Sequence, residues 1–280
     1  MDDEITHAYC VGNSKAILRA RCTDLYTFEL EYPRFIHSEF MTHRMFGRCA
    51  SSSRAVPVER TIDNILIEPW APLHVYKNCK GMQGKDLVNE EDYDSFVELW
   101  DDAKYKAINT AYQMIDKGFH KQHVNRILEP FTKIKVIVTA TEWDNFFKLR
   151  LSPDADPEIQ DLAKAIKAAM DNAWGTLINV HDGRTLPYVS FDEMDAIDDN
   201  RVLTLISAAR CARVSYLNHD GSKPDILKDL ALAKRLINSG HMTPFEHQCR
   251  QVYDTGFNYN LRDFQSARYM LDHGIDLSAP

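Results

Sequence analysis

The feature that most constrains this chain is a stretch of helical periodicity at residues 93–117. Apolar side chains recur there every three or four residues, which places them on one face of a helix. Gly118 follows the stretch, and glycine commonly ends a helix. We therefore expect one long helix and a fold with a substantial helical part. The apolar positions are Phe96, Val97, Trp100, Ala107, Ile108, Ala111 and Ile115.

A strand and several shorter helices are expected beside it. Apolar and polar residues alternate over 25–32, which predicts a strand. The sequence Asp156-Pro157-Glu158 combines a capping carboxylate, a proline and an acid in the first turn, so a helix is expected from there to Trp174. The other expectations are helices over 35–46, 201–213, 225–239, the second half of 131–150 and from Thr243, a loop at 51–53 and a polar connector over 78–92.

Composition places the chain among ordinary globular proteins. Of its 280 residues, 44% are hydrophobic and 26% charged, so the chain can bury a substantial core. No apolar run approaches the roughly 20 residues of a membrane span, and MDDEITHAYC at the start lacks the pattern of a signal peptide. We therefore expect a cytoplasmic protein with no membrane partner.

A single domain, 1–280, is expected, with an acidic surface linker, 192–200, joining an N-terminal part, 1–191, to a C-terminal part, 201–280.

Charge and cysteine usage narrow the possible functions. The net charge of −8 argues against nucleic acid as a partner, since phosphate backbones are held by an excess of lysine and arginine. Residues 34–60 differ from the rest of the chain in charge. They contain five arginines and two glutamates, which give a local charge of +3 that suits a small anion. The six cysteines form no C-x-x-C pair, so neither a disulfide framework nor a zinc ribbon is expected.

The segment MTHRMFGRCASSSRAVP, residues 41–57, concentrates hydrogen-bond donors. Arginine forks and serine hydroxyls beside backbone N–H groups suit a phosphate monoester. The alternative is an arginine-rich surface exposed to water, which is the usual role of a run of charges. Cys49 lies among these arginines, where a lowered pKa would make it a nucleophile, although a buried and unreactive cysteine is more common.

A second candidate segment is GHMTPFEHQCR, residues 240–250. His241 and His247 are six residues apart, which is not the spacing of helical zinc ligands, and we expect no metal site. Thr243 begins a helix whose N-terminus could face an anion. The alternative is a corner between two helices, with a threonine cap and a histidine satisfied within the fold.

Other arginines have structural explanations on spacing alone. Arg126 stands by itself before the short apolar pair of NRILEP, and such an isolated arginine is usually structural. Arg262, Gln265 and Arg268 fall three residues apart on one face of a helix expected over 258–271, where surface salt bridges are expected. The chain has no Gly-x-Gly-x-x-Gly, Walker or Gly-x-Ser-x-Gly motif, so neither a Rossmann fold nor a P-loop enzyme is indicated.

Taken together, these segments resemble the flavin-dependent thymidylate synthases. The family's signature is an Arg-His-Arg triplet followed by serine, asparagine, glutamate, serine and arginine at fixed offsets. GHMTPFEH resembles its His-x-Thr/Ser-Pro-Phe-Glu-His segment, and AARCARVSY (208–216) resembles its Ala-Ala-Arg-Val-Ser-Tyr; NRILEP, DNFFKLR and DADPEI resemble three more segments. The first two precede the triplet in better-known members and follow it here, so the chain resembles a circularly permuted member. The matched positions of the signature are His43, Arg44, Ser52 and Arg54.

The resemblance is incomplete at positions that contact flavin or nucleotide in the family. Thr42 stands where the triplet has its first arginine, and Glu39 stands where the family has glutamine. The family's Asn-Ala-Arg is Thr139-Ala140-Thr141 here. Gly47, Cys49 and Ala50 replace the serine, asparagine and glutamate of the signature.

The resemblance implies an α/β (α+β) fold in a homotetramer with active sites between subunits. It implies an enzyme that methylates C5 of dUMP reductively with FAD, NADPH and 5,10-methylenetetrahydrofolate, and that places reactants and holds charge rather than using a protein nucleophile. It assigns Arg150 to catalysis, where the guanidinium stabilises negative charge on the pyrimidine. The implied substrate ligands are Glu39, Ser52, Ser53, Arg54, Arg126 and Arg150, and the implied FAD ligands are His43, Arg44, Asn145, Ser215, His241, Thr243 and Glu246.

Two alternatives stay open. Because the departures surround the cofactor, the same lineage could support C5-hydroxymethylation of dUMP or dCMP. A chain that has lost flavin would instead be a non-catalytic nucleotide-binding protein.

Overall fold

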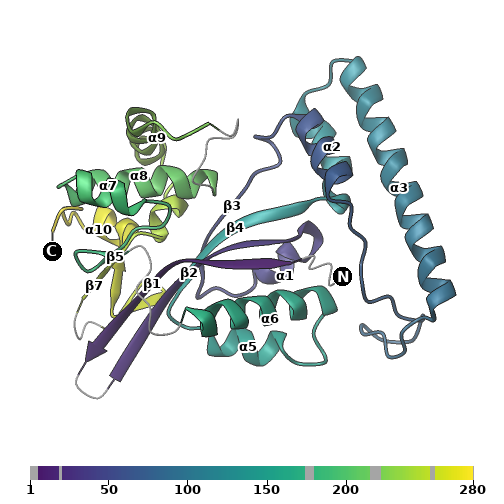
Figure 1. Cartoon of the computed structure of the whole chain (residues 1–280), viewed down its shortest axis with the longest axis horizontal. Coiled ribbons are helices and arrows are strands. Elements are labelled where there is room, and N and C mark those ends of the chain that lie inside the picture. Colours follow the sequence, from purple (N-terminus) through teal and green to yellow (C-terminus); the bar gives the residue numbers. More distant parts are fainter. Residues whose placement is uncertain (1–5, 19–20, 174–179, 215–221, 253–255, 280) are drawn as a thin grey trace.

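A four-stranded antiparallel sheet is the centre of the fold (Figure 1). The computed structural model describes residues 6–18, 21–173, 180–214, 222–252 and 256–279. It combines helices and sheets, as the sequence predicts, and the strand expected over 25–32 lies within β2. The strand order is β1-β2-β4-β3, with β1 His7–Leu18, β2 Arg21–Pro33, β3 Gly47–Ala50 and β4 Lys133–Ala140.

From Val136 to Ala140, strand β4 is buried on both faces. Val136 and Val138 pack on one face with β2 and with helices α5 (Asp144–Arg150) and α6 (Pro157–Asn172). Ile137 points the other way and packs with Tyr188, Cys211 and Val214. Because both faces are buried there, the sequence KIKVIVTA is largely apolar instead of alternating between apolar and polar residues. The spacing of its apolar residues therefore could not distinguish a strand from a helix.

Two helices of the N-terminal part lie close to where the sequence predicts them. The Asp156 side chain accepts from the Glu158 N–H (3.1 Å) and caps α6. The expected long helix is α3 (Glu90–Asp116), capped by Asn89. It lies at the far end of the molecule from the C-terminal part (Figure 1). Short elements complete this part: η1 Arg34–Ile36, α1 His37–Phe40, α2 Val58–Ile67, α4 Lys121–Leu128 and η2 Glu129–Phe131.

The C-terminal part has its own core, in which helices α8 and α9 pack with η3 and α10. A second antiparallel sheet, with the order β10-β7-β6-β5, joins β7 and β10 of the C-terminal part to β5 and β6 at the end of the N-terminal part, and β8 and β9 form a hairpin. Within the described residues, no helix combines the length and the hydrophobicity that crossing a bilayer requires. The bounds are β5 Val180–His181, β6 Arg184–Thr185, α7 Phe191–Ala196, α8 Asn200–Arg213, α9 Ile226–Asn238, η3 Thr243–Glu246, β7 Cys249–Gln251, β8 Phe257–Asn258, β9 Leu261–Arg262, β10 Phe264–Ser266 and α10 Ala267–Asp272.

Three local predictions were wrong. The acidic linker expected over 192–200 holds most of helix α7, whose Glu193 binds the buried Arg210. The helix expected over 258–271 is a hairpin, a strand and the short α10, because Tyr259 and Asp263 adopt left-handed backbone angles (φ 56° and 59°) that an α-helix cannot contain. Over 35–46 only η1 and the four-residue α1 are helical.

A buried ionic network connects α7, α8 and α9. The Arg210 side chain is 1% exposed, and its Nε donates to Asp229 Oδ2 (3.0 Å). Its terminal nitrogens donate to both Glu193 carboxylate oxygens (2.7 and 2.6 Å) and to the Tyr188 carbonyl (2.7 Å). The hydrogen bonds from Arg210 hold the pKa of Glu193 at about 2, well below its usual range. Arg210 is therefore a structural arginine whose donors are satisfied within the fold.

Replacing Arg210 should destabilise the protein strongly. Arg210→Met removes the buried partner of Glu193 and one of the two arginines that bind Asp229, and we expect a loss of about 3–5 kcal/mol in the free energy of unfolding. Chemical denaturation measures this loss. Arg201→Met, at the exposed start of the same helix, is the matched control and should change stability by less than about 0.5 kcal/mol. Equal stabilities of the two variants would contradict a structural role for the network.

Candidate functional site

Arg150, at the end of α5, contacts one residue of α1 and two residues of the segment between α1 and β3. Its Nε donates to His43 Nε2 (2.9 Å), and one terminal nitrogen binds the Glu39 carboxylate. The other donates to Thr42 Oγ1 (3.4 Å). Since a guanidinium has five N–H groups, these contacts orient Arg150 and leave donors for a ligand. The structure thus brings together Arg150, Glu39 and His43, three residues that the sequence assigned to the site; we call them, with Thr42, the Arg150 cluster.

His43 is neutral in this cluster. Its ring is buried and packs edge-on against Phe146, with 4.9 Å between the ring centroids. Burial, with smaller effects from the charges of Arg150 and Arg48, lowers the pKa of His43 from 6.5 to about 4. Because Nε2 accepts from Arg150, the ring proton is on Nδ1. His43 therefore orients Arg150 and adds no positive charge of its own at neutral pH.

The serine-rich loop that follows β3 is held in place from two sides. The Ser51 N–H donates to the Lys135 carbonyl on β4 (2.8 Å). The Asn125 side chain on α4 donates to the carbonyls of Ser53 (2.6 Å) and Val56 (3.0 Å). The segment 51–56 is therefore a loop, as predicted, but it is fixed at both ends by neighbouring elements.

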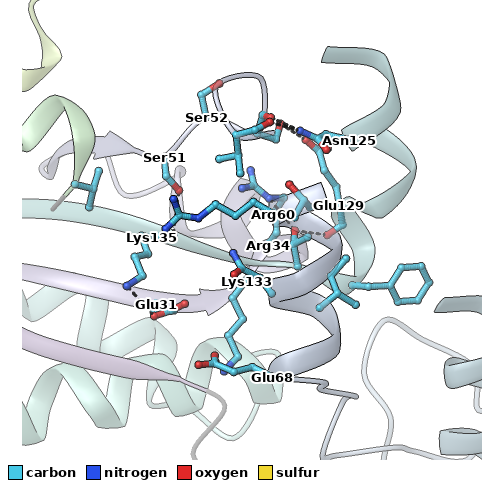
Figure 2. Close-up of a pocket in the computed structure, with 18 of the residues that line it drawn as sticks. Glu31, Arg34, Ser51, Ser52, Arg60, Glu68, Asn125, Glu129, Lys133 and Lys135 are labelled. Atoms are coloured by element: carbon cyan, nitrogen blue, oxygen red, sulfur yellow. Dashed lines mark hydrogen bonds and ion pairs between the residues drawn. The ribbon is translucent and has the colours of Figure 1, made fainter. Parts of the chain in front are cut away.

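A cavity of about 390 Å³ lies beside this loop. Figure 2 shows Ser51 and Ser52 on one side of it, Glu31 and Glu68 on the other, and cationic side chains between them. We call it the serine-loop cavity. Its cations outnumber its carboxylates, so it suits an anion. The lining cations are Arg34, Arg60, Lys133, Lys135 and Arg213, and the carboxylates are Glu31, Glu68 and Glu129.

The ion pairs within this cavity are loose. Lys133 Nζ lies 3.6 Å from Glu68, and Lys135 Nζ lies 3.4 Å from Glu31. The Glu68 side chain is 64% exposed and the Lys135 side chain 49% exposed, and ion pairs of this kind contribute little to stability. An entering anion can therefore compete for both lysines.

The residues assigned to the substrate phosphate do not all lie in the cavity. Ser52 and Ser53 line it, and the Ser53 hydroxyl donates to Glu129 Oε1 (2.7 Å). The same oxygen accepts from Arg126 (3.0 Å), whose side chain is 59% exposed. Arg54 is exposed and, like Arg126, does not line the cavity. The structure thus brings two of the four assigned residues to one cavity and leaves two on the surface.

The residues assigned to FAD are likewise divided. Glu246 is bound within the chain by Arg268 and by the Arg48 N–H, and burial raises the pKa of Glu246. A side chain at Gly47 would place its Cβ 3.2 Å from Glu246, so the glycine that replaces the family's serine allows this close approach. Ser215 lies outside the described residues. The exposed members of the set are Arg44, Asn145, His241 and Thr243.

Other departures from the family pattern serve internal contacts. Thr139 lies in a buried chain of hydrogen bonds with Thr27 (2.8 Å) and His247 (2.9 Å). Thr141 Oγ1 accepts from the Arg262 N–H (3.0 Å). Burial raises the pKa of the Cys49 thiol to about 11, which keeps the thiol protonated at neutral pH.

The arginines near the C-terminus form ion pairs, although they share no helix. Arg262 binds Glu142 (2.7 Å) and Arg268 binds Glu246, so the expected salt bridges are present. Gln265, on β10, accepts from Arg250 (2.9 Å). These contacts hold the C-terminal hairpin and α10 against the segments around Glu142 and Glu246.

Several cavity residues were missed in the sequence. Lys133 and Lys135 are two apart on β4 and therefore share a face, and this spacing was the available signal. Arg34 and Arg60 belong to the positive segment but were given no role. Arg213 reaches the cavity from the end of α8, which no local pattern indicates.

Comparison with known proteins identifies the family. Residues 24–174 match the family described as thymidylate synthase complementing protein. The chain belongs to this family. The match covers more than half of the chain and runs from β2 through α6, so it includes both the Arg150 cluster and the serine loop. The recognition made from the sequence motifs is thus confirmed, whereas the permuted order stays a prediction.

Two individual proteins are similar to parts of this chain. A flavin-dependent thymidylate synthase from Aquifex aeolicus (strain VF5) is 28% identical over 147 residues, which are 51% of this chain and 44% of that protein. The chain thus matches less than half the length of this relative. The crystal structure of a UMP/dUMP methylase PolB from Streptomyces cacaoi bound with 5-Br UMP is 20% identical, with a TM-score of 0.42 over 55% of this chain and 70% of that chain.

The depressed pKa of His43 is directly measurable. In a proton NMR titration the His43 ring should titrate near pH 4. Arg150→Met should raise this pKa while leaving it below 6.5, because burial lowers the pKa of His43 more than the charge of Arg150 does. The pKa shift also affects stability. Because the folded-state pKa of His43 lies below the unfolded-state pKa, the stabilisation from neutral His43 is complete above pH 6.5 and is lost as the pH falls toward 4. Arg44→Met, at an exposed neighbour, should leave the titration unchanged; a His43 midpoint near 6.5 in the unmodified protein would contradict the buried cluster.

Proposed function

We propose that this chain is a flavin-dependent enzyme that methylates C5 of dUMP, with 5,10-methylenetetrahydrofolate as carbon donor and NADPH as reductant. One observation carries the proposal. The segment that matches the family contains the oriented Arg150 cluster and most of the residues that line the cationic serine-loop cavity. A nucleotide needs both, since its phosphoryl group is a dianion and its base must be held for reaction.

The serine-loop cavity is the proposed phosphoryl site. A phosphate monoester accepts several charge-assisted hydrogen bonds, which the serine hydroxyls and cavity cations can donate. Ser53 can contribute only if its hydroxyl leaves Glu129. Arg54 and Arg126 are exposed, so we propose that they complete the site when subunits assemble.

The Arg150 cluster is the proposed site of the pyrimidine. Its guanidinium is oriented in advance by Glu39, Thr42 and His43, and preorganised donors stabilise charge that develops during a reaction. Neutral His43 accepts from Arg150 without competing for an anionic base. Arg150 is accordingly the residue that we propose stabilises the negative charge on the ring.

The proposed cofactor is FAD, which supplies a hydride when bound. Arg44, Asn145, His241 and Thr243 present exposed donors, and such donors fit a cofactor with a pyrophosphate group. His43 and Glu246 are engaged within the chain, so we propose that they position neighbouring residues instead of binding flavin directly.

A homotetramer with sites between subunits is part of this proposal. On helix α3, Tyr105 is 55% exposed and Tyr112 is 46% exposed, and their spacing of seven residues places both on one face. We propose that another subunit covers this face. Light scattering of the purified protein measures the assembly directly.

Product analysis tests the reaction. Purified protein supplied with dUMP, the folate, FAD and NADPH should yield the methylated nucleotide by mass spectrometry. A hydroxymethylated product from dUMP or dCMP would support the second candidate, which the altered positions Thr42, Thr139 and Thr141 motivate.

Arg150→Met should lower kcat by about 100-fold or more, as loss of a charge-stabilising donor does. Arg201→Met, far from both sites in the chain, should retain full activity; equal rates for the two variants would contradict the role of Arg150.

The visible spectrum separates an enzyme from a binding protein. Protein purified or reconstituted with FAD should show the absorption bands of bound oxidised flavin. The combined variant Arg44→Gln, His241→Gln should retain less flavin, because two exposed donors are removed. Protein that takes up no added FAD, yet binds dUMP, would favour the non-catalytic alternative.

A further inference from the structure

Arg213, the last residue of α8, is an arginine whose hydrogen bonding within the described residues is incomplete. Its side chain is 10% exposed, and Nη1 donates to Asp229 Oδ1 (2.6 Å). Its Nε and Nη2 atoms are buried and have no hydrogen-bond partner within the part of the chain that the structure describes. Arg213 lines the serine-loop cavity together with Ser51, Ser52 and Ser53.

A structural role with Asp229 does not account for these two nitrogens. Asp229 already accepts from Arg210 (3.0 Å), so its charge has a partner without Arg213. Burying charged donors without acceptors is unfavourable. The Nε and Nη2 donors lie side by side on one edge of the guanidinium, and this edge matches two oxygens of a phosphate group.

The backbone beside Arg213 also indicates a fixed geometry. Val214 has φ 51° and ψ 48°, in the left-handed region that a β-branched residue rarely adopts. Such a conformation costs on the order of 1–3 kcal/mol and persists only where the surrounding structure imposes it. Val214 lines the same cavity and ends α8 there, so the helix stops where Arg213 meets the cavity.

The cavity also holds a buried acceptor without a partner among the residues that the structure describes. Asn125 is 1% exposed, and its Oδ1 has no hydrogen-bond partner within the described residues, while its nitrogen donates to Ser53 and Val56. A simple inorganic anion carries acceptors only. A nucleoside monophosphate carries phosphoryl acceptors and a sugar hydroxyl that donates, so it can satisfy both Arg213 and Asn125.

We propose that Arg213 is a ligand of the substrate phosphoryl group, bound through Nε and Nη2, and that it makes the site specific for the monophosphate over the nucleoside. The inference rests on the proposed function and deepens it. Arg213 lies outside the segment 24–174 that matches the family, so the C-terminal part contributes a substrate ligand to a cavity built mostly by the N-terminal part.

The test compares dUMP with deoxyuridine, two ligands that differ only in the phosphoryl group. Dissociation constants are measured for the unmodified protein and for Arg213→Gln, by calorimetry or, for weak binding, by ligand-observed NMR. The variant should bind dUMP about 10- to 100-fold more weakly, the usual effect of losing hydrogen bonds to a charged group. Its affinity for deoxyuridine should be unchanged. Arg201→Gln, at the other end of α8, should alter neither affinity.

Each other outcome overturns the inference. Equal loss of affinity for both ligands would assign Arg213 to general folding of the cavity, and unchanged affinity for dUMP would remove it from the site while the proposed function stands. Unmodified protein that binds no dUMP would overturn the proposed function as well. If Arg213→Gln does not fold, the same two dissociation constants are measured for Arg213→Lys. This variant keeps a positive charge beside Asp229 but lacks the edge with two parallel donors.

Discussion

The hydrogen bonds of β4 to β2 on one side and to β3 on the other are the constraint on which the site depends. Both faces of β4 are buried, so a shift in register by one residue would exchange the environments of Ile137 and Val138. The pairing fixes the four residues of β3, and the bond from Ser51 to Lys135 extends it into the serine loop. Glu39, Thr42 and His43, which precede β3 in the chain, and the serine loop, which follows it, are therefore connected to the sheet through the pairing of β3 with β4.

Three arginines show how the number of satisfied N–H groups separates structural from functional roles. Arg210 is bound on all three of its nitrogens by groups of the fold. Arg150 is oriented by its neighbours and retains donors. Arg213 is anchored through one nitrogen, and the other two are buried without partners in the described part of the chain. Burial alone does not distinguish these residues, because all three are largely withdrawn from water.

Local sequence patterns were enough to predict β2, α3 and the capped start of α6. Alternation of apolar and polar residues, helical spacing of apolar residues and an Asp-Pro pair depend only on neighbours in the sequence. The motifs also identified the family. The acidic stretch at 192–200 was misread because Glu193 finds its partner on another helix. The helix expected near the C-terminus does not form because Tyr259 and Asp263 adopt left-handed backbone angles. Neither residue type by itself predicts such angles.

The candidate site was predictable in the same uneven way. Arg150, Glu39 and His43 were identified by motif and do meet. The cations of the cavity come from β4 and from the end of α8, and only tertiary packing brings these elements beside the serine loop. The exposure of Arg54 and Arg126 could not be inferred from their motifs either, because it depends on how α4 and the loop pack.

The most direct test of the central claim is a crystal structure of the protein with dUMP. The account predicts phosphoryl oxygens within hydrogen-bonding distance of the serine loop, and a pyrimidine ring against Arg150 of the same or a neighbouring subunit. Nucleotide bound away from both, with the cavity filled only by solvent, would contradict it.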